Sequence, residues 1–187
     1  MRINDRFFDN YDIRSKYVHN RDLVKCVTYP EVLGLNLDQL NFTKDIIEYI
    51  YMKAYECFEE AAKAGIYEAY YYLGMMNYNG LYTKKNKNKA FYYYCKAGAY
   101  SHALSYYELY QMLKNNDVNI YDNEKERKKA MFDYLKISAE EGYPAAMYEL
   151  ANEYIKGDLC EADHYLSLAW HRHACRNGYF LSYVFYP

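Results

Sequence analysis

Two cysteines and two histidines near the C-terminal end of the sequence have the residue types of a zinc site. Cys160 and His164 are four residues apart, as are His171 and Cys175, and seven residues separate His164 from His171. Side chains four apart share one face of a helix and can bind the same metal ion. However, the two pairs would lie about 10 Å apart along such a helix, too far for one tetrahedral zinc. We therefore expect neither a metal nor a cofactor.

Catalytic chemistry has no signature in this sequence. The chain contains no glycine-rich phosphate loop, no G-x-S-x-G nucleophile turn and no H-E-x-x-H motif. Its acidic pairs, Glu59-Glu60 and Glu140-Glu141, fall at expected helix ends, where solvated carboxylates are ordinary. We expect a protein that is not an enzyme.

Basic residues beside tyrosines could bind single-stranded RNA, because cations neutralise phosphates and tyrosine rings stack on bases. The first cluster is Lys84, Lys85, Lys87 and Lys89, and the second is Arg127, Lys128 and Lys129. The net charge of −2 argues against nucleic acid as the partner. RNA binding is therefore the alternative function and not the first one.

The composition also bears on the compartment. The five cysteines are odd in number and follow no repeated spacing, which favours reduced thiols. No apolar run is long enough to span a bilayer, and the first ten residues contain acids where a secretory peptide needs an apolar stretch. These features predict a cytoplasmic chain with no membrane partner.

The elements that must position any site belong to a repeating unit. Gly65, Ser101, Gly142 and Gly178 recur at intervals of 101 − 65 = 36, 142 − 101 = 41 and 178 − 142 = 36 residues. Periods in this range are typical of stacked helical hairpins. The five extra residues of the middle interval fall in one loop, around residues 115–122, and a loop is where such arrays tolerate insertions.

Aligned positions within the unit support helices. Four residues after each of the four starting residues stands a small residue, and Gly80, Asn116 and Gly157 stand where a left-handed residue would close a helix. The pattern predicts an N-terminal cap over residues 1–44 and a repeat array over 45–187. The predicted helices cover residues 45–63, 67–79, 87–99, 103–115, 124–140, 144–156 and 161–176.

Three stretches resemble a known repeat family. They are Ala69-Tyr-Tyr-Tyr-Leu73-Gly74-Met-Met-Asn-Tyr78-Asn79-Gly80, then Lys89-Ala90-Phe91-Tyr-Tyr93-Tyr94-Cys-Lys96-Ala97, and residues 142–157. All are similar to the Sel-one-like repeat (SLR), a relative of the tetratricopeptide repeats. The resemblance implies an all-α solenoid that acts as a non-catalytic scaffold or adaptor for a protein or peptide partner. Tyr110 and Ala151 replace the motif glycine and Asn77 its tyrosine, and we expect Tyr110 to push two helices apart locally.

By this resemblance the first helix of each hairpin lines a concave partner-binding surface. We number positions from the starting residue of each unit, so that position seven of the first unit is Tyr72. Taking 100° per residue, we expect positions seven, ten, eleven and fourteen to face this surface. The predicted partner-binding residues are Tyr72, Met75, Met76, Asn79, Glu108, Gln111, Met112, Glu149, Asn152 and Glu153. This surface would suit a peptide with apolar anchors followed by Lys or Arg. The alternative is that these are ordinary solvated helix faces.

Two further features remain open at this stage. The 28 tyrosines are explained either by core packing with a biased genome composition or by a groove lined with rings. The apolar residues Phe180, Leu181, Tyr183, Val184 and Phe185 form an edge suited to self-association.

Overall fold

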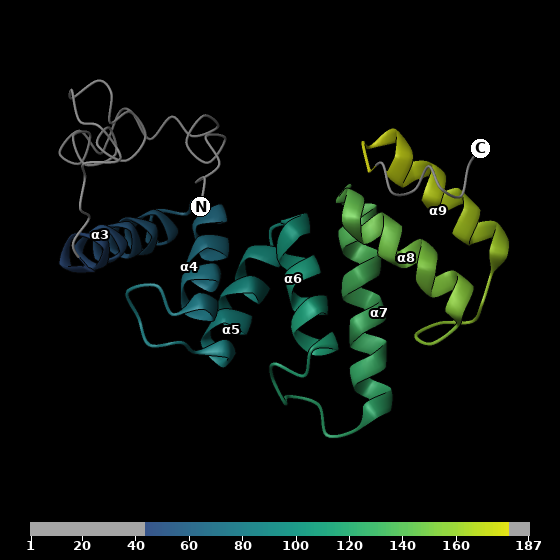
Figure 1. The fold of residues 1–187 in the computed structure, drawn as a ribbon, viewed down its shortest axis with the longest axis horizontal. Helices are drawn as coiled ribbons and strands as arrows, with labels where there is room; N and C mark the ends of the chain where they lie inside the picture. Colours follow the sequence, from purple (N-terminus) through teal and green to yellow (C-terminus); the bar gives the residue numbers. More distant parts are fainter. Residues whose placement is uncertain (1–43, 180–187) are drawn as a thin grey trace. The chain divides into compact units, whose positions relative to one another are not determined.

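The computed structural model describes residues 44–179, and helices dominate this part of the chain (Figure 1). The helices are α3 (Lys44–Lys63), α4 (Glu68–Asn79), α5 (Lys87–Gly98), α6 (Ala103–Lys114), α7 (Glu124–Glu140), α8 (Pro144–Lys156) and α9 (His164–Arg176). The N-terminal cap predicted over residues 1–44 and the apolar edge predicted between residues 180 and 185 lie outside the described residues, apart from Lys44.

The chain divides into two compact units, residues 1–52 and 53–187, and the boundary falls inside α3. Of the first unit the structure describes only residues 44–52, which form the start of α3. The second unit contains the remainder of α3 and the helices α4 to α9.

Within the second unit the helices form three hairpins, α4–α5, α6–α7 and α8–α9. The hairpins stack in sequence order, because α5 also packs on α6 and α7 also packs on α8 (Figure 1). The described part of the chain contains helices and no strand. The predicted all-α solenoid of stacked helical hairpins is therefore confirmed.

The turns explain why the helices begin and end where the sequence predicts. Gly65, Ser101, Gly142 and Gly178 all have positive φ, and so do the helix-closing residues Gly80, Asn116 and Gly157. Glycine adopts this conformation without strain, which accounts for its recurrence at these positions. The helix α9 begins three residues later than predicted. The side chain of Asp163 accepts hydrogen bonds from the backbone N–H groups of Tyr165 and Leu166 and so caps the helix.

Small and branched residues at fixed positions build the core. Leu73, Leu109 and Leu150 occupy the same position in successive first helices and are completely or almost completely buried. Buried alanines occur in first helices, such as Ala146 in α8, and in second helices, such as Ala97 in α5. They allow close approach of neighbouring helices. A hydrogen bond of 2.7 Å from Ser138 Oγ to the Ala103 carbonyl also ties α7 to α6.

Tyr110, which replaces the motif glycine, is accommodated in the core. In the first hairpin this position is Gly74, and a Cβ there would lie 2.6 Å from the ring of Tyr94. The second hairpin has the smaller Leu135 at the position equivalent to Tyr94, and both Tyr110 and Leu135 are buried. The Tyr110 hydroxyl lies 3.4 Å from Glu149 Oε2 in α8, so the side chain reaches the next hairpin.

Between residues 44 and 179, no helix combines enough length with enough apolar character to cross a membrane.

Candidate functional site

The predicted partner-binding residues lie on α4, α6 and α8, and we call the side of these helices that they occupy the first-helix face. Tyr72, Met75, Glu108, Gln111, Glu149 and Asn152 are half-buried there, and Asn79 is exposed. Each therefore keeps some surface that a partner could contact. Whether a partner does so stays a prediction.

Position eleven of the unit does not lie on this face, which corrects part of the predicted set. Met76, Met112 and Glu153 are all buried. On a helix of 100° per residue, position eleven lies about 20° from position four, the small buried residue, so helical geometry itself places it in the core. The carboxylate of Glu153 has one oxygen 3.6 Å from Lys156 Nζ, and its Oε2 has no hydrogen-bond partner among the described residues.

Pairs of aromatic rings join each first helix to the start of the next unit. The ring centroids of Tyr71 and His102 lie 5.0 Å apart. The equivalent pairs, Tyr107 with Tyr143 and Tyr148 with Tyr179, both have centroids 4.9 Å apart. The three pairs repeat along the array at the same positions of the unit, and each contributes a packing contact between neighbouring units.

The partners of these tyrosines also recur in the sequence. His102, Tyr143 and Tyr179 each stand one residue after Ser101, Gly142 and Gly178. This recurrence is visible in the sequence. Only the contacts show that each of these rings packs on a tyrosine of the preceding first helix. The ring pairs are half-buried. Many tyrosines therefore serve the packing between units while they also form part of a surface.

Glu108 differs from the other half-buried carboxylate of the first-helix face in its ion pairing. It forms no ion pair with any described cation. Burial raises the pKa of Glu108 above its ordinary value. Burial also raises the pKa of Tyr71 and of Tyr143, and the negative charge of Glu108 raises both further. The negative charge of Glu108 thus acts on the hydroxyl of one tyrosine in each of two successive ring pairs.

Glu149 occupies the equivalent position one unit later but is already paired. Its Oε2 accepts hydrogen bonds from Lys114 Nζ at 3.1 Å and from the Tyr110 hydroxyl at 3.4 Å. Burial, together with the nearby charge of Glu149, raises the pKa of Tyr110 to about 12, although Lys114 opposes the shift. The first-helix face therefore carries one neutralised carboxylate and one that a partner could neutralise.

The first basic cluster is largely engaged within the chain. Lys87 forms an ion pair with Asp117, which also accepts a hydrogen bond of 2.6 Å from the Tyr78 hydroxyl. Lys89 donates a hydrogen bond of 2.9 Å to the Tyr55 hydroxyl. The ammonium group of Lys85 lies 5.4 Å from the centre of the Tyr78 ring. Much of the positive charge that RNA binding would need therefore stabilises the repeat array.

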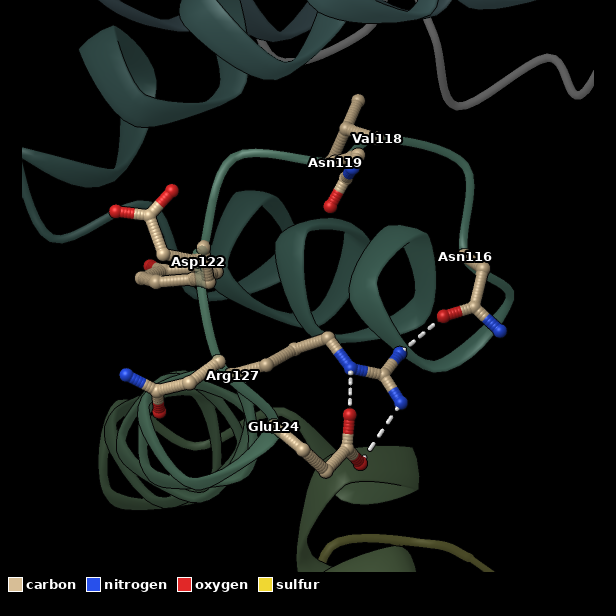
Figure 2. Close-up of a pocket in the computed structure, with 8 residues that line it drawn as sticks. Asn116, Val118, Asn119, Asp122, Glu124 and Arg127 are labelled. Atoms are coloured by element: carbon tan, nitrogen blue, oxygen red, sulfur yellow. Dashed lines mark hydrogen bonds and ion pairs between the residues drawn. The ribbon is translucent and has the colours of Figure 1, made fainter.

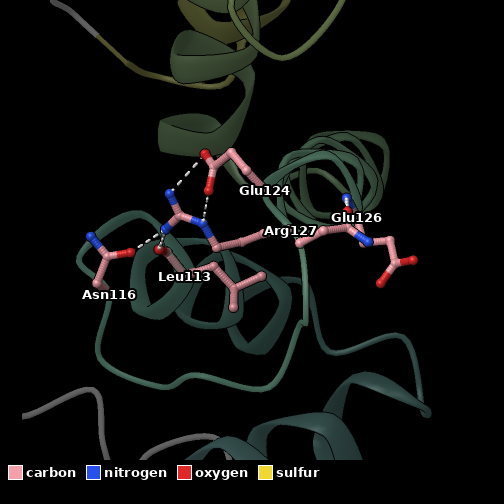
Figure 3. A network of polar contacts seen from close by, with 6 residues as sticks. Leu113, Asn116, Glu124, Glu126 and Arg127 are labelled. Carbon is pink, nitrogen blue, oxygen red and sulfur yellow. Dashed lines mark hydrogen bonds and ion pairs between the residues drawn. The ribbon is translucent and has the colours of Figure 1, made fainter.

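The second basic cluster contributes an arginine that holds the insertion loop, residues 115–123. Nε and Nη2 of Arg127 donate to the two carboxylate oxygens of Glu124, at 2.9 and 3.0 Å. Its Nη1 donates to the Leu113 carbonyl at 2.7 Å and also to Asn116 Oδ1 (Figure 3). Lys128 and Lys129 are exposed. With all three guanidinium nitrogens occupied, Arg127 has a structural role.

A cavity of about 290 Å³ lies beneath the insertion loop (Figure 2). Asn116, Asn119, Asp122, Glu124 and Arg127 contribute to its lining. Because Arg127 is already paired with Glu124, the cavity offers no uncompensated cation to an anionic ligand.

The cysteines and histidines considered for zinc are separated by the fold. Cys160 precedes α9, which begins at His164. His171 is buried, with its ring centroid 5.5 Å from that of Tyr148. Across residues 44–179, no group of three or more His, Cys, Asp or Glu side chains could hold a metal ion.

Comparison with known proteins finds one repeat family at three places along this array of helical hairpins. The Sel1 repeat family matches residues 51–66, 68–99 and 144–179. These three segments of the chain are Sel1 repeats, as the sequence resemblance predicts. The hairpin of α6 and α7, which carries Tyr110 and the insertion loop, lies between the matched segments.

Two solved structures share the fold. A Sel1 repeat protein from Oxalobacter formigenes superposes with a TM-score of 0.60 at 20% identity, over 68% of this chain and 92% of that one. A protective antigen of uropathogenic Escherichia coli strains, which displays an SLR fold, gives a TM-score of 0.61 at 21% identity. That match covers 74% of this chain but only 30% of the antigen. No curated relative matches the sequence. Sel1 repeats generally mediate protein–protein interactions and typically form non-enzymatic scaffolds.

Proposed function

We propose that this chain is a non-catalytic adaptor whose first-helix face binds a peptide or protein segment. The observation that carries the proposal is the arrangement around Glu108. Glu108 is a half-buried carboxylate without a described ion pair, and its charge acts on tyrosines of two successive ring pairs. The partly accessible Tyr72 and Met75 lie on the preceding first helix.

This arrangement favours a partner segment that carries Lys or Arg next to apolar side chains. A cation placed at Glu108 would form a charge-assisted contact with the carboxylate and offset its negative charge, which acts on Tyr71 and Tyr143. Tyr72 and Met75 offer contact area to an apolar residue, since methionine adapts its shape to different partners. The rigid stacking of the hairpins limits the conformational entropy that binding would cost.

The occupied basic clusters count against the alternative of single-stranded RNA. Lys87, Lys89 and Arg127 are all hydrogen-bonded within the chain. Glu108 on the first-helix face would also repel phosphate groups. We keep RNA binding only as an outcome that the experiment can detect.

The test is selection from a displayed library of random peptides, followed by measurement of the affinity of synthetic hits. We expect hits that carry Lys or Arg beside an apolar residue, and a loss of about tenfold in affinity for Glu108→Gln. Glu140→Gln makes the same chemical change at an exposed position of α7 and should leave the affinity unchanged.

A second pair of variants tests the apolar contribution. Tyr72→Ala should weaken binding, whereas Tyr92→Ala, at an exposed position of α5, should not. Hits without basic residues, or equal affinity of the Glu108 and Glu140 variants, would refute the role of Glu108. Strong, salt-dependent binding of single-stranded RNA without peptide binding would replace the proposal by the alternative.

A further inference from the structure

The outer side of α9 exposes apolar side chains that no described helix covers. Tyr165 is 89% exposed and Leu168 is 47% exposed, and the neighbouring Leu166 and Ala169 are exposed as well. In the described region α9 packs on α8. Four exposed apolar residues within five positions of one helix exceed what scattered surface residues would give.

The repeat shows what covers the equivalent position inside the array. Leu168 stands ten residues before Gly178, and Phe91 stands ten residues before Ser101. Phe91 is only 9% exposed, and its ring centroid lies 6.4 Å from that of Tyr134 in α7. The cover over this position therefore includes the second helix of the following hairpin.

The first helix of the following hairpin also contributes to this cover. The ring centroid of Phe132, which stands ten residues before Gly142, lies 6.2 Å from that of Tyr154 in α8. Gly98, three residues before Ser101, lies so close to the Tyr106 ring of α6 that an added Cβ would be 3.1 Å from it.

We propose that a second copy of this chain covers the outer side of α9, with the two α9 helices antiparallel about a two-fold axis. Such a contact is isologous, so each copy offers the same residues. Tyr165, Leu168 and Arg172 are spaced three and four residues apart and form one stripe along the helix. With the axis near Leu168 and Ala169, Tyr165 of each copy lies opposite Arg172 of the other, a ring–cation contact.

The charges around α9 match this orientation. Asp158 and Glu161 precede the helix, whereas Arg172 and Arg176 lie in its second half. Only an antiparallel arrangement brings the acidic end of one copy to the basic end of the other. It also opposes the two helix dipoles.

Sedimentation velocity of the full chain over a range of concentrations tests the proposal. We expect a particle of twice the 22.5 kDa chain mass for the wild type and the mass of a single chain for Leu168→Glu. Ile120→Glu is the matched control, because Ile120 is also 47% exposed but lies in the insertion loop, and it should remain dimeric. Circular dichroism of each variant shows whether the fold is kept.

A charge exchange makes the test specific for the antiparallel arrangement. Arg176→Glu should weaken the dimer about tenfold, and adding Glu161→Lys in the same chain should restore it. A wild type that stays monomeric at all concentrations would overturn the proposal. So would a dimer that survives Leu168→Glu, or a charge exchange that fails to restore it.

Discussion

Replacing Gly74 by alanine tests how closely the two helices of the first hairpin are packed. The new Cβ would lie 2.6 Å from Cε1 and 2.7 Å from Cδ1 of the Tyr94 ring. Contacts between carbon atoms are optimal at about 3.5 to 4 Å, so the ring would have to move by about 1 Å. Tyr94 is buried in the core, and the Tyr71 ring follows at a centroid distance of 5.7 Å. The room for such a movement is therefore small.

The expected loss of stability combines two opposing effects. Overpacking of a well-packed core costs about 1 to 3 kcal/mol, and two ring atoms in direct conflict place this site near the upper end. Alanine is the better helix former by about 1 kcal/mol, which offsets part of that cost. We expect Gly74→Ala to lower the free energy of unfolding by about 1 to 2 kcal/mol.

Urea unfolding followed by circular dichroism measures this difference. Gly98→Ala is the control, since its Cβ would meet the half-buried Tyr106 ring at 3.1 Å, and we expect a change within about 0.5 kcal/mol. Adding Tyr94→Leu to Gly74→Ala, which introduces the residue type of Leu135, should recover at least about 1 kcal/mol relative to additivity. A Gly74→Ala variant as stable as the wild type, or an additive double variant, would refute the packing argument.

Three other substitutions probe the turns and the insertion loop. Ser101→Gly should raise the free energy of unfolding by about 1 kcal/mol in the same assay, because Ser101 is exposed with φ of 59°. Asp117→Asn should cost about 1 to 2 kcal/mol at neutral pH. Burial tends to raise the pKa of Asp117, but hydrogen bonds from Lys87 and Tyr78 outweigh it and hold the pKa below its ordinary 3.8. The ionised Asp117 therefore contributes to the free energy of unfolding above pH 3.8, and this contribution is lost as the pH falls through the lowered pKa of the folded state. Between pH 7 and pH 2, the free energy of unfolding should fall more steeply in the wild type than in Asp117→Asn. Arg127→Ala should lower the free energy of unfolding by only about 1 kcal/mol, because its partner Glu124 is solvent-exposed. The same substitution should speed proteolytic cleavage within residues 115–123. Unchanged cleavage would contradict the role of Arg127 in holding this loop.

The repeat spacing predicted the helices well because it reflects backbone requirements. The positive φ at Gly65, Gly142 and Gly178 and the caps at the helix starts are local properties, so sequence alone places the helix ends within a few residues. The exception, the start of α9, depended on which of several acidic residues caps the helix. Asp163 does so, and Asp158 and Glu161 precede it.

The side chains of the candidate site were harder to predict, for two reasons. The sequence prediction puts Met76 and Met112 on the partner-binding surface, but both are buried. Their helical angle places them beside the small buried residue at position four of the unit. The use of Lys87 and Arg127 within the fold depends on Asp117 and Asn116, which belong to the insertion loop. No periodicity predicts how such a loop folds, because it occurs in one unit only.

The hairpin of α6 and α7 also bears on how repeat arrays are counted. It has a tyrosine where the motif has glycine and a loop lengthened by five residues, and it lies outside the segments that match the Sel1 family. Yet it stacks on both neighbours like the other hairpins and holds Leu109, Tyr110 and Leu135 completely buried. A gap between recognised motifs can therefore hide a structurally intact unit. Estimates of array length from motif matches alone are then too short, and so is any binding surface inferred from them.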